Sequence, residues 1–194
     1  MCAFFGANMN KFSISSNNKS NQSGMTFIEV LIALVIIVTG ILGAVAMQAT
    51  AKQGSFDAMQ RSLASSLAQD IIGRIRSNGV NNIAAYSIDD YGAILDDVPV
   101  NQCTNANAPC NEATMVINDM YEWELSLIGG DVTENDVPRG GLIGGRGCIF
   151  QNGNAVTVVV SWLGRNEMRD SEKSDDCGIA GARRRQVIVE AFII

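Results

Sequence analysis

The sequence predicts an α+β fold in which a long N-terminal helix packs against an antiparallel sheet. Apolar residues first form an unbroken run and then recur every three or four positions as far as Asn78, which indicates a helix. From Gly140 onward, alternating and β-branched residues separated by turn signals indicate strands. Helices and strands that follow one another in blocks are typical of α+β domains.

The first part of the predicted helix, residues 25–51, is apolar enough to cross a membrane. The 22 residues from Val30 to Ala51 carry no charge, and about 20 apolar residues span a bilayer as a helix. One acid, Glu29, lies just inside this segment. A carboxylate at the bilayer centre costs about 2.5–3.5 kcal/mol on insertion scales, and less near the end, where it reaches the headgroups. Glu29 is therefore tolerable there but calls for a role.

Residues 1–24 differ from the rest of the chain. They contain Lys11 and Lys19 but no acid, and they lack the separate apolar block and small-residue cleavage site of a secretory signal peptide. The two lysines favour a cytoplasmic N-terminus, and Met1 and Met9 are both candidate start residues. Loss of this segment with its two lysines changes the net charge from −6 to −8. So acidic a chain is a poor candidate for a general nucleic-acid surface.

Residues 52–78 continue the helix as an amphipathic segment. Its apolar stripe is predicted to form core against the sheet, and it consists of Phe56, Met59, Leu63, Leu67, Ile71 and Ile75. Arg74 and Arg76 suit the negative end of a helix, and Gly79 can adopt a left-handed cap. The helix is therefore expected to end at Asn78.

Residues 79–194 are predicted to form one small α+β head. A second helix is expected from Asn111, a capping residue, to Ile128, before Gly129-Gly130. Strands are expected at 146–151, 155–163 and 184–193, the first two joined by a tight turn at Asn152-Gly153. The glycine-rich stretch 140–147 lacks the lysine and following helix of a phosphate-binding loop, so turns are expected there.

Four cysteines lie beyond the apolar segment, whereas Cys2 falls in residues 1–24. An even set in an exported head predicts two disulfides, and three connectivities are open. We favour Cys103 with Cys110, which closes a short loop, and Cys148 with Cys177, which fastens the loop before the last strand. Metal binding is the alternative, but the chain has no CxxC pair and no histidine. No metal or cofactor is expected.

Catalysis is not expected either, because a chain without histidine cannot form Ser-His or Cys-His nucleophile pairs. The adjacent acids of the loops are interpreted as solvated, and the two acidic groups do not follow the spacing of a calcium loop. These residues are Asp89, Asp90, Asp96 and Asp97, then Asp131, Glu134 and Asp136, and Asp170, Glu172, Asp175 and Asp176. The basic cluster Arg183, Arg184 and Arg185 supports a separate hypothesis, binding of DNA or a surface.

Residues 24–33, Gly-Met-Thr-Phe-Ile-Glu-Val-Leu-Ile-Ala, resemble the N-terminal motif of type IV prepilins and type II secretion pseudopilins. The resemblance implies cleavage between Gly24 and Met25 by prepilin peptidase and N-methylation of Met25, where the family usually has phenylalanine. It also gives Glu29 a partner, the α-amino group of Met25 in a neighbouring subunit. An ion pair of this kind gains several kcal/mol where the effective dielectric is low.

Residues 67–78 resemble the helix end of minor pilins of the PilV type, the type IV pilus modification proteins, and less specific matches follow at 119–123, 156–162 and 184–190. The resemblance implies a pilin fold and a structural subunit without catalysis that helps to prime the pilus or lies at its tip. Its implied partners are other major and minor pilins, prepilin peptidase and the inner-membrane assembly platform. The implied location is the inner membrane as a single-pass protein, then the filament. A type II secretion pseudopilin is the alternative.

Overall fold

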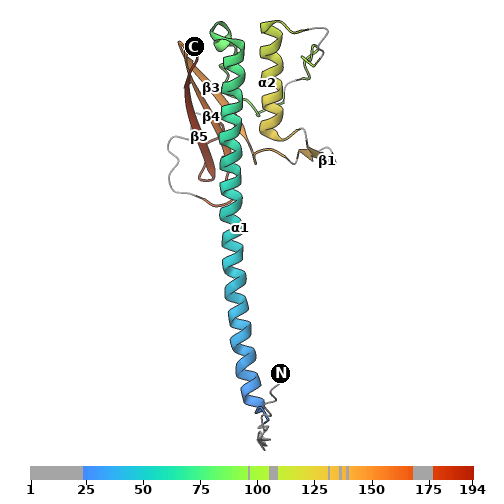
Figure 1. The fold of residues 1–194 in the computed structure, drawn as a ribbon, viewed down its shortest axis with the longest axis vertical. Coiled ribbons are helices and arrows are strands. Elements are labelled where there is room, and N and C mark those ends of the chain that lie inside the picture. Colours follow the sequence, from blue (N-terminus) through green and yellow to red (C-terminus); the bar gives the residue numbers. More distant parts are fainter. Residues whose placement is uncertain are drawn as a thin grey trace, which may run out of the picture. The chain divides into compact units, whose positions relative to one another are not determined.

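The computed structural model describes residues 24–95, 97–104, 109–130, 132–135, 137–138, 140–167 and 177–194. The chain divides into two compact units, Met1–Ala46 and Met47–Ile194. Helix α1, Phe27–Asn78, begins in the first unit and ends in the second (Figure 1).

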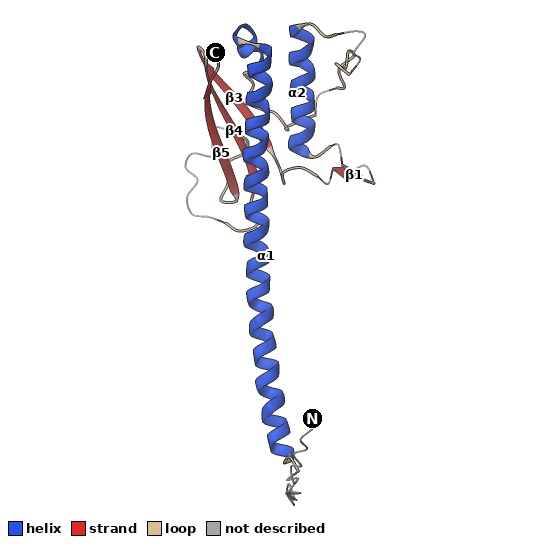
Figure 2. Cartoon of the chain, in the orientation of Figure 1, coloured by secondary structure: helices blue, strands red, loops and turns tan. Residues whose placement is uncertain are grey.

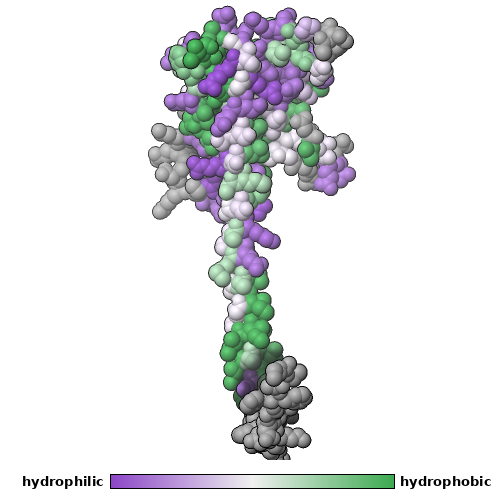
Figure 3. All heavy atoms as spheres, viewed as in Figure 1, coloured by the Kyte–Doolittle hydropathy of each residue, from purple (hydrophilic) through white to green (hydrophobic). Residues whose placement is uncertain are grey.

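The first unit is represented by the N-terminal part of α1. Its large apolar side chains from Phe27 to Val45 are all exposed, and Figure 3 colours most of this segment as hydrophobic. By length and composition α1 could cross a membrane, since it contains a strongly apolar window near the N-terminus. The segment has no core of its own within the described chain, so its apolar surface fits lipid or another apolar partner.

The second unit has the predicted α+β architecture. After α1 come a short 3₁₀ helix, η1 (Val80–Tyr86), and helix α2 (Glu112–Ile128), followed by the strands. Strands β3 (Arg146–Asn152), β4 (Ala155–Leu163) and β5 (Arg184–Phe192) form an antiparallel sheet in that order. A small separate hairpin joins β1 (Thr133–Glu134) to β2 (Val137–Pro138). Figure 2 shows helices and strands segregated in this way, and the prediction of a long helix packed on an antiparallel sheet is confirmed.

The ends of both helices lie where the sequence signals predict them. Helix α1 ends at Asn78, and Gly79 follows with a φ of 77°. At the start of α2 the side chain of Asn111 accepts a hydrogen bond of 2.8 Å from the backbone N–H of Thr114. At its end Gly129 adopts the left-handed conformation with a φ of 72°. These caps satisfy helix-terminal groups that would otherwise lack partners.

The predicted apolar stripe of α1 is correct in its second half and wrong at Met59. Leu67, Ile71 and Ile75 are buried, whereas Met59 is 57% exposed. Its neighbour Gln60 is buried instead, because its side-chain oxygen accepts a hydrogen bond of 3.2 Å from the backbone N–H of Ile143. A buried amide needs such a partner.

The β3–β4 hairpin forms as predicted, but its turn is shifted by one residue. Asn152 pairs with Ala155, so Gly153 and Asn154 are the two central residues. Gly153 has a φ of 60°. A two-residue hairpin turn whose first central residue has a positive φ selects glycine at that position, which explains the shift.

The core lies between the helices and one face of the sheet. Trp123 of α2 is fully buried, packs edge-to-face on Tyr91 at 5.0 Å, and donates its indole N–H to the carbonyl of Leu67 at 2.8 Å. Gly147 makes room for this indole, since a Cβ there would lie 2.5 Å from the ring. The remaining large buried side chains include Trp162, Ile71, Ile75, Val156, Val158 and Val160.

Candidate functional site

The first candidate site is the N-terminal end of α1. Gly24, Met25 and Thr26 precede the helix, and the backbone N–H of Glu29 donates to the carbonyl of Thr26 at 3.0 Å. Glu29 lies in the first helical turn, where the helix dipole favours a negative charge. Gly24 is exposed and Met25 is 78% exposed. The peptide bond between Gly24 and Met25 is therefore accessible, and it lies outside the helix.

The polar groups of the following apolar segment are satisfied internally. The hydroxyl of Thr39 lies 3.0 Å from the carbonyls of both Val35 and Ile36, to which it donates. A hydroxyl bonded to the preceding helical turn presents little unmet polarity to its surroundings. Residues 27–46 therefore combine an apolar surface with one charged side chain, Glu29, at the N-terminal end.

Residues 19–45 match the family model of the prokaryotic N-terminal methylation motif. The chain carries a motif typical of type IV pilins and pseudopilins. This motif implies processing by prepilin peptidase and assembly with other pilins. With the apolar helix, it indicates a pilin-like prepilin that is anchored in the inner membrane and then enters a filament. No curated protein and no solved structure matches the chain.

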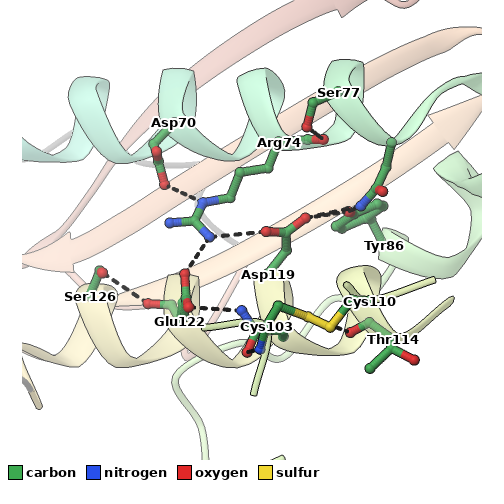
Figure 4. Close-up of polar contacts among 12 residues, drawn as sticks. Asp70, Arg74, Ser77, Tyr86, Cys103, Cys110, Thr114, Asp119, Glu122 and Ser126 are labelled. Carbon is green, nitrogen blue, oxygen red and sulfur yellow. Dashed lines mark hydrogen bonds and ion pairs between the residues drawn. A yellow bond between two sulfur atoms is a disulfide. The ribbon is translucent and has the colours of Figure 1, made fainter. Parts of the chain in front are cut away.

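The second candidate site is a polar cluster between α1 and α2 in the head (Figure 4). The guanidinium of Arg74 donates to Asp70 at 2.9 Å, to Asp119 at 3.1 Å and to Glu122 at 2.8 Å. The other oxygen of Asp119 accepts from the hydroxyl of Tyr86 at 2.8 Å and from the amide of Asn78 at 3.0 Å. Asp119 is only 6% exposed. The cluster therefore fastens the end of α1 and η1 to the middle of α2.

The charges of this cluster shift one another's protonation. The hydrogen bond from Arg74 lowers the pKa of Glu122 more than its partial burial raises it, and Asn118 lowers it further. Burial lowers the pKa of Arg74, but the carboxylates of Glu122, Asp70 and Asp119 outweigh burial and raise it overall. Burial, together with the charge of Asp119, raises the pKa of the Tyr86 hydroxyl. Each group stays in the form that its partners require at neutral pH.

The cysteines lie in the pairs that the sequence favours. Cys103 is bonded to Cys110 with a Cα separation of 5.6 Å, and Cys148 is bonded to Cys177 with a Cα separation of 5.7 Å. The first bridge lies beside the start of α2, as Figure 4 shows. The second ties β3 to the segment before β5, where the sulfur atoms are fully buried with Val159. The second bridge therefore holds a connecting segment against a strand, whereas the first closes a loop within the segment that precedes α2.

The three consecutive arginines do not form one basic surface. Arg183 has a side chain 60% exposed, 3.8 Å from Glu167. Arg184 is only 7% exposed and donates to the carbonyls of Gly144 and Ile179, and burial and the nearby charge of Arg146 lower its pKa. The side chain of Arg185 is 14% exposed, 3.9 Å from Asp57. Neighbouring residues of a strand point to opposite faces, so the cluster seen in the sequence is dispersed.

Within the described ranges, no group of three or more His, Cys, Asp or Glu side chains is placed to hold a metal ion. Of the acidic loop residues, Asp89, Asp90, Asp97 and Glu134 are described. The others lie outside the described residues, namely Asp96, Asp131, Asp136, Asp170, Glu172, Asp175 and Asp176. Most of residues 1–24 also lie outside, with only Gly24 described.

Sequence reasoning missed the partners of Arg74. It assigned this residue to the helix end, whereas the structure directs it across to α2, to acids 45 and 48 residues away. One signal could have found them: Asp119 and Glu122 are three residues apart and therefore share a face of α2, the arrangement that a single guanidinium can bridge.

Proposed function

We propose that the chain is a minor pilin of the type IV pilus modification (PilV) type, a low-abundance structural subunit that primes the pilus or lies at its tip. The observation that carries the proposal is the position of Glu29, in the first turn of an apolar helix and five residues after Gly24. An exposed glycine followed by an exposed Met25 suits peptidase access. We place the leader at residues 1–24, the filament-core helix at 25–51, its amphipathic continuation at 52–78 and the head at 79–194.

In this proposal cleavage creates the partner of Glu29. Removal of residues 1–24 frees the α-amino group of Met25, and this positive charge pairs with Glu29 of a neighbouring subunit. Surrounded by apolar residues such as Phe27, Ile28 and Val30, both charges would be costly alone. Each subunit that enters the filament therefore neutralises a charge of its neighbour. The head adds no catalytic step. Its two disulfides are consistent with a location outside the cytoplasm, where conditions are oxidising.

The test compares cells with and without prepilin peptidase. Mass spectrometry is expected to find a chain that begins at N-methylated Met25 in fibres sheared from wild-type cells, and a full-length chain in the membrane fraction when the peptidase is absent. Glu29→Val is expected to be processed normally but to be absent from fibres, whereas the control Glu29→Asp keeps the charge and retains incorporation. Normal amounts of Glu29→Val in fibres would refute the role of Glu29.

The same motif fits a type II secretion pseudopilin, and the fibre experiment separates the two functions. Recovery of the mature chain in surface pili supports the minor pilin. Retention in the periplasm, together with loss of protein secretion when the chain is deleted, assigns it to the secretion system instead. The dispersal of Arg183, Arg184 and Arg185 gives no observation that favours DNA binding over these functions.

A further inference from the structure

In the described part of the molecule, the outer edge of β5 leaves the backbone groups of Ile188, Glu190 and Phe192 open. Strand β5 pairs only with β4 in its sheet. The N–H of Ile193 donates to Asn154 and the carbonyl of Arg183 accepts from Gly164. In an antiparallel strand, every second residue directs its N–H and C=O groups toward a given neighbouring strand. Both bonds place the odd-numbered residues, such as Arg183 and Ile193, on the β4 side. The even-numbered residues, including Ile188, Glu190 and Phe192, therefore direct their N–H and C=O groups away from β4.

The opposite edge of the sheet is covered by the chain itself. On β3 the outward N–H of Gly147 donates to Tyr91 at 2.9 Å, and that of Ile149 donates to Ile88 at 2.7 Å. The hydroxyl of Ser87 donates to the carbonyl of Ile149 at 3.0 Å. The segment after η1 thus covers this edge, and in the described part of the molecule β5 has no such cover at Ile188, Glu190 and Phe192.

The edge carries one protecting charge, the exposed Glu190, but it lacks the other features that prevent strand addition. The nine residues of β5 include no proline and no lysine, and their pairing with β4 is regular throughout. Ile188 is 49% exposed and Phe192 is 62% exposed, with the exposed Glu190 between them on the same face. Natural proteins protect long apolar edges with charges, proline or bulges, because such edges readily accept another strand.

The chemistry of this edge specifies its occupant. A row of open N–H and C=O groups is matched by an extended peptide, and the alternating side chains set its sequence. Apolar side chains would pack beside Ile188 and Phe192, and a basic residue would face Glu190. A second copy of β5 does not meet these requirements. The one basic residue that can stand directly opposite Glu190 in an antiparallel copy is Arg184, which is buried against the carbonyls of Gly144 and Ile179.

We propose that β5 is a docking edge that receives an extended strand from a different subunit of the same assembly, a strand with apolar residues on either side of a lysine or arginine. This inference rests on the proposed function, since it names how the head contacts a partner subunit. It adds a contact made by the head to the contact made by the N-terminal helix.

The test places a photoactivatable benzophenone amino acid at position 188, 190 or 192 of the full-length chain in whole cells. Position 117 on α2, where the isoleucine is 58% exposed, is the control. Strand addition predicts cross-links to one segment of another subunit, moving along that segment by two residues when the probe moves by two. Cross-links to a second copy, a helical spacing of three or four, or yields no higher than at position 117 would overturn the proposal.

Two substitutions test the edge independently of the probe. Glu190→Pro removes an outward N–H that does not bond to β4, and Ile188→Lys places a positive charge on the docking edge. Loss of about 1.4 kcal/mol corresponds to a tenfold weaker contact, so each variant is expected to reduce capture of the partner segment by a probe at position 192 at least tenfold. Ile117→Lys is the matched control and should leave it unchanged.

Thermal unfolding verifies that the variants fold. If Glu190→Pro does not fold, Ile188→Lys alone tests the docking edge. Unchanged capture in a folded variant contradicts the proposal. The cross-link is scored separately from fibres and N-terminal processing. Normal processing and incorporation without the stepped cross-links reject the docking edge alone, whereas an unprocessed chain that is absent from fibres rejects the proposed function.

Discussion

Replacement of Arg74 by leucine is expected to destabilise the head far more than replacement of its most exposed partner. Removal of one member of a buried ion pair costs about 3–5 kcal/mol because the remaining charge stays buried. The side chain of Arg74 is 26% exposed and that of Asp119 only 9%. Asp119 keeps its hydrogen bonds from Tyr86 and Asn78. We therefore expect Arg74→Leu to lower the free energy of unfolding by about 2–3 kcal/mol, less than the loss for a fully buried ion pair, because the site is partly exposed and Asp119 keeps other partners.

Asp70→Asn is the matched control. Asp70 is bonded to the same guanidinium at 2.9 Å, but its side chain is 47% exposed and lies four residues away on the same helix. Such pairs contribute about 0.3–0.5 kcal/mol. Urea unfolding of the mature chain in detergent micelles, followed by tryptophan fluorescence, measures both variants. Equal losses of stability for Arg74→Leu and Asp70→Asn would refute the assignment of Arg74 as the link between the two helices.

Three further predictions concern the head. Because Glu122 has a lowered pKa in the folded state, its contribution to stability is present above its unfolded pKa of about 4.3 and is lost as the pH falls through the folded value. Urea midpoints should thus fall less steeply with acidification in Glu122→Gln. Gly147→Ala should lower the free energy of unfolding by about 1–3 kcal/mol, because the new methyl group overpacks against the buried indole. Gly73→Ala lies in a helix with open space around it and should raise the free energy of unfolding by about 1 kcal/mol. Equal thermal midpoints for the two variants would contradict this difference. Replacing Cys148 and Cys177 by alanine should cost about 3.5 kcal/mol for a separation of 29 residues, and an unchanged urea midpoint would count against it.

Local signals predicted the regular elements well. Helix α2 was identified by Asn111 and Gly129, since caps act within a few residues of the helix end. A run of β-branched residues identified β4, which is buried along most of its length, and alternation identified β5, along which exposed and half-buried residues alternate. The two-residue strands β1 and β2 and the helix η1 were not predicted, because such short elements have no periodicity to detect.

Tertiary contacts explain what was mispredicted. Periodicity extended the buried stripe of α1 to Met59, but burial of a helix face depends on where the partner surface ends. The three arginines look equivalent in the sequence, yet Arg184 is drawn inward by the carbonyls of Gly144 and Ile179, whereas Arg183 stays exposed. The N-terminal motif was recognisable because its residues are contiguous, whereas the proposed partner of Glu29 belongs to another chain.

The hydrogen bond from the Trp123 indole to the Leu67 carbonyl restricts how α2 can be aligned along α1. Successive carbonyls of a helix turn by about 100°, so a slip of one residue would move the acceptor out of reach of the indole. A slip of a whole turn would restore a carbonyl, but it would replace Arg74 opposite Asp119 by Asp70 or Ile71 in one direction and by Ser77 or Asn78 in the other. The indole N–H of Trp123 and the guanidinium of Arg74 together allow only one axial alignment of the two helices.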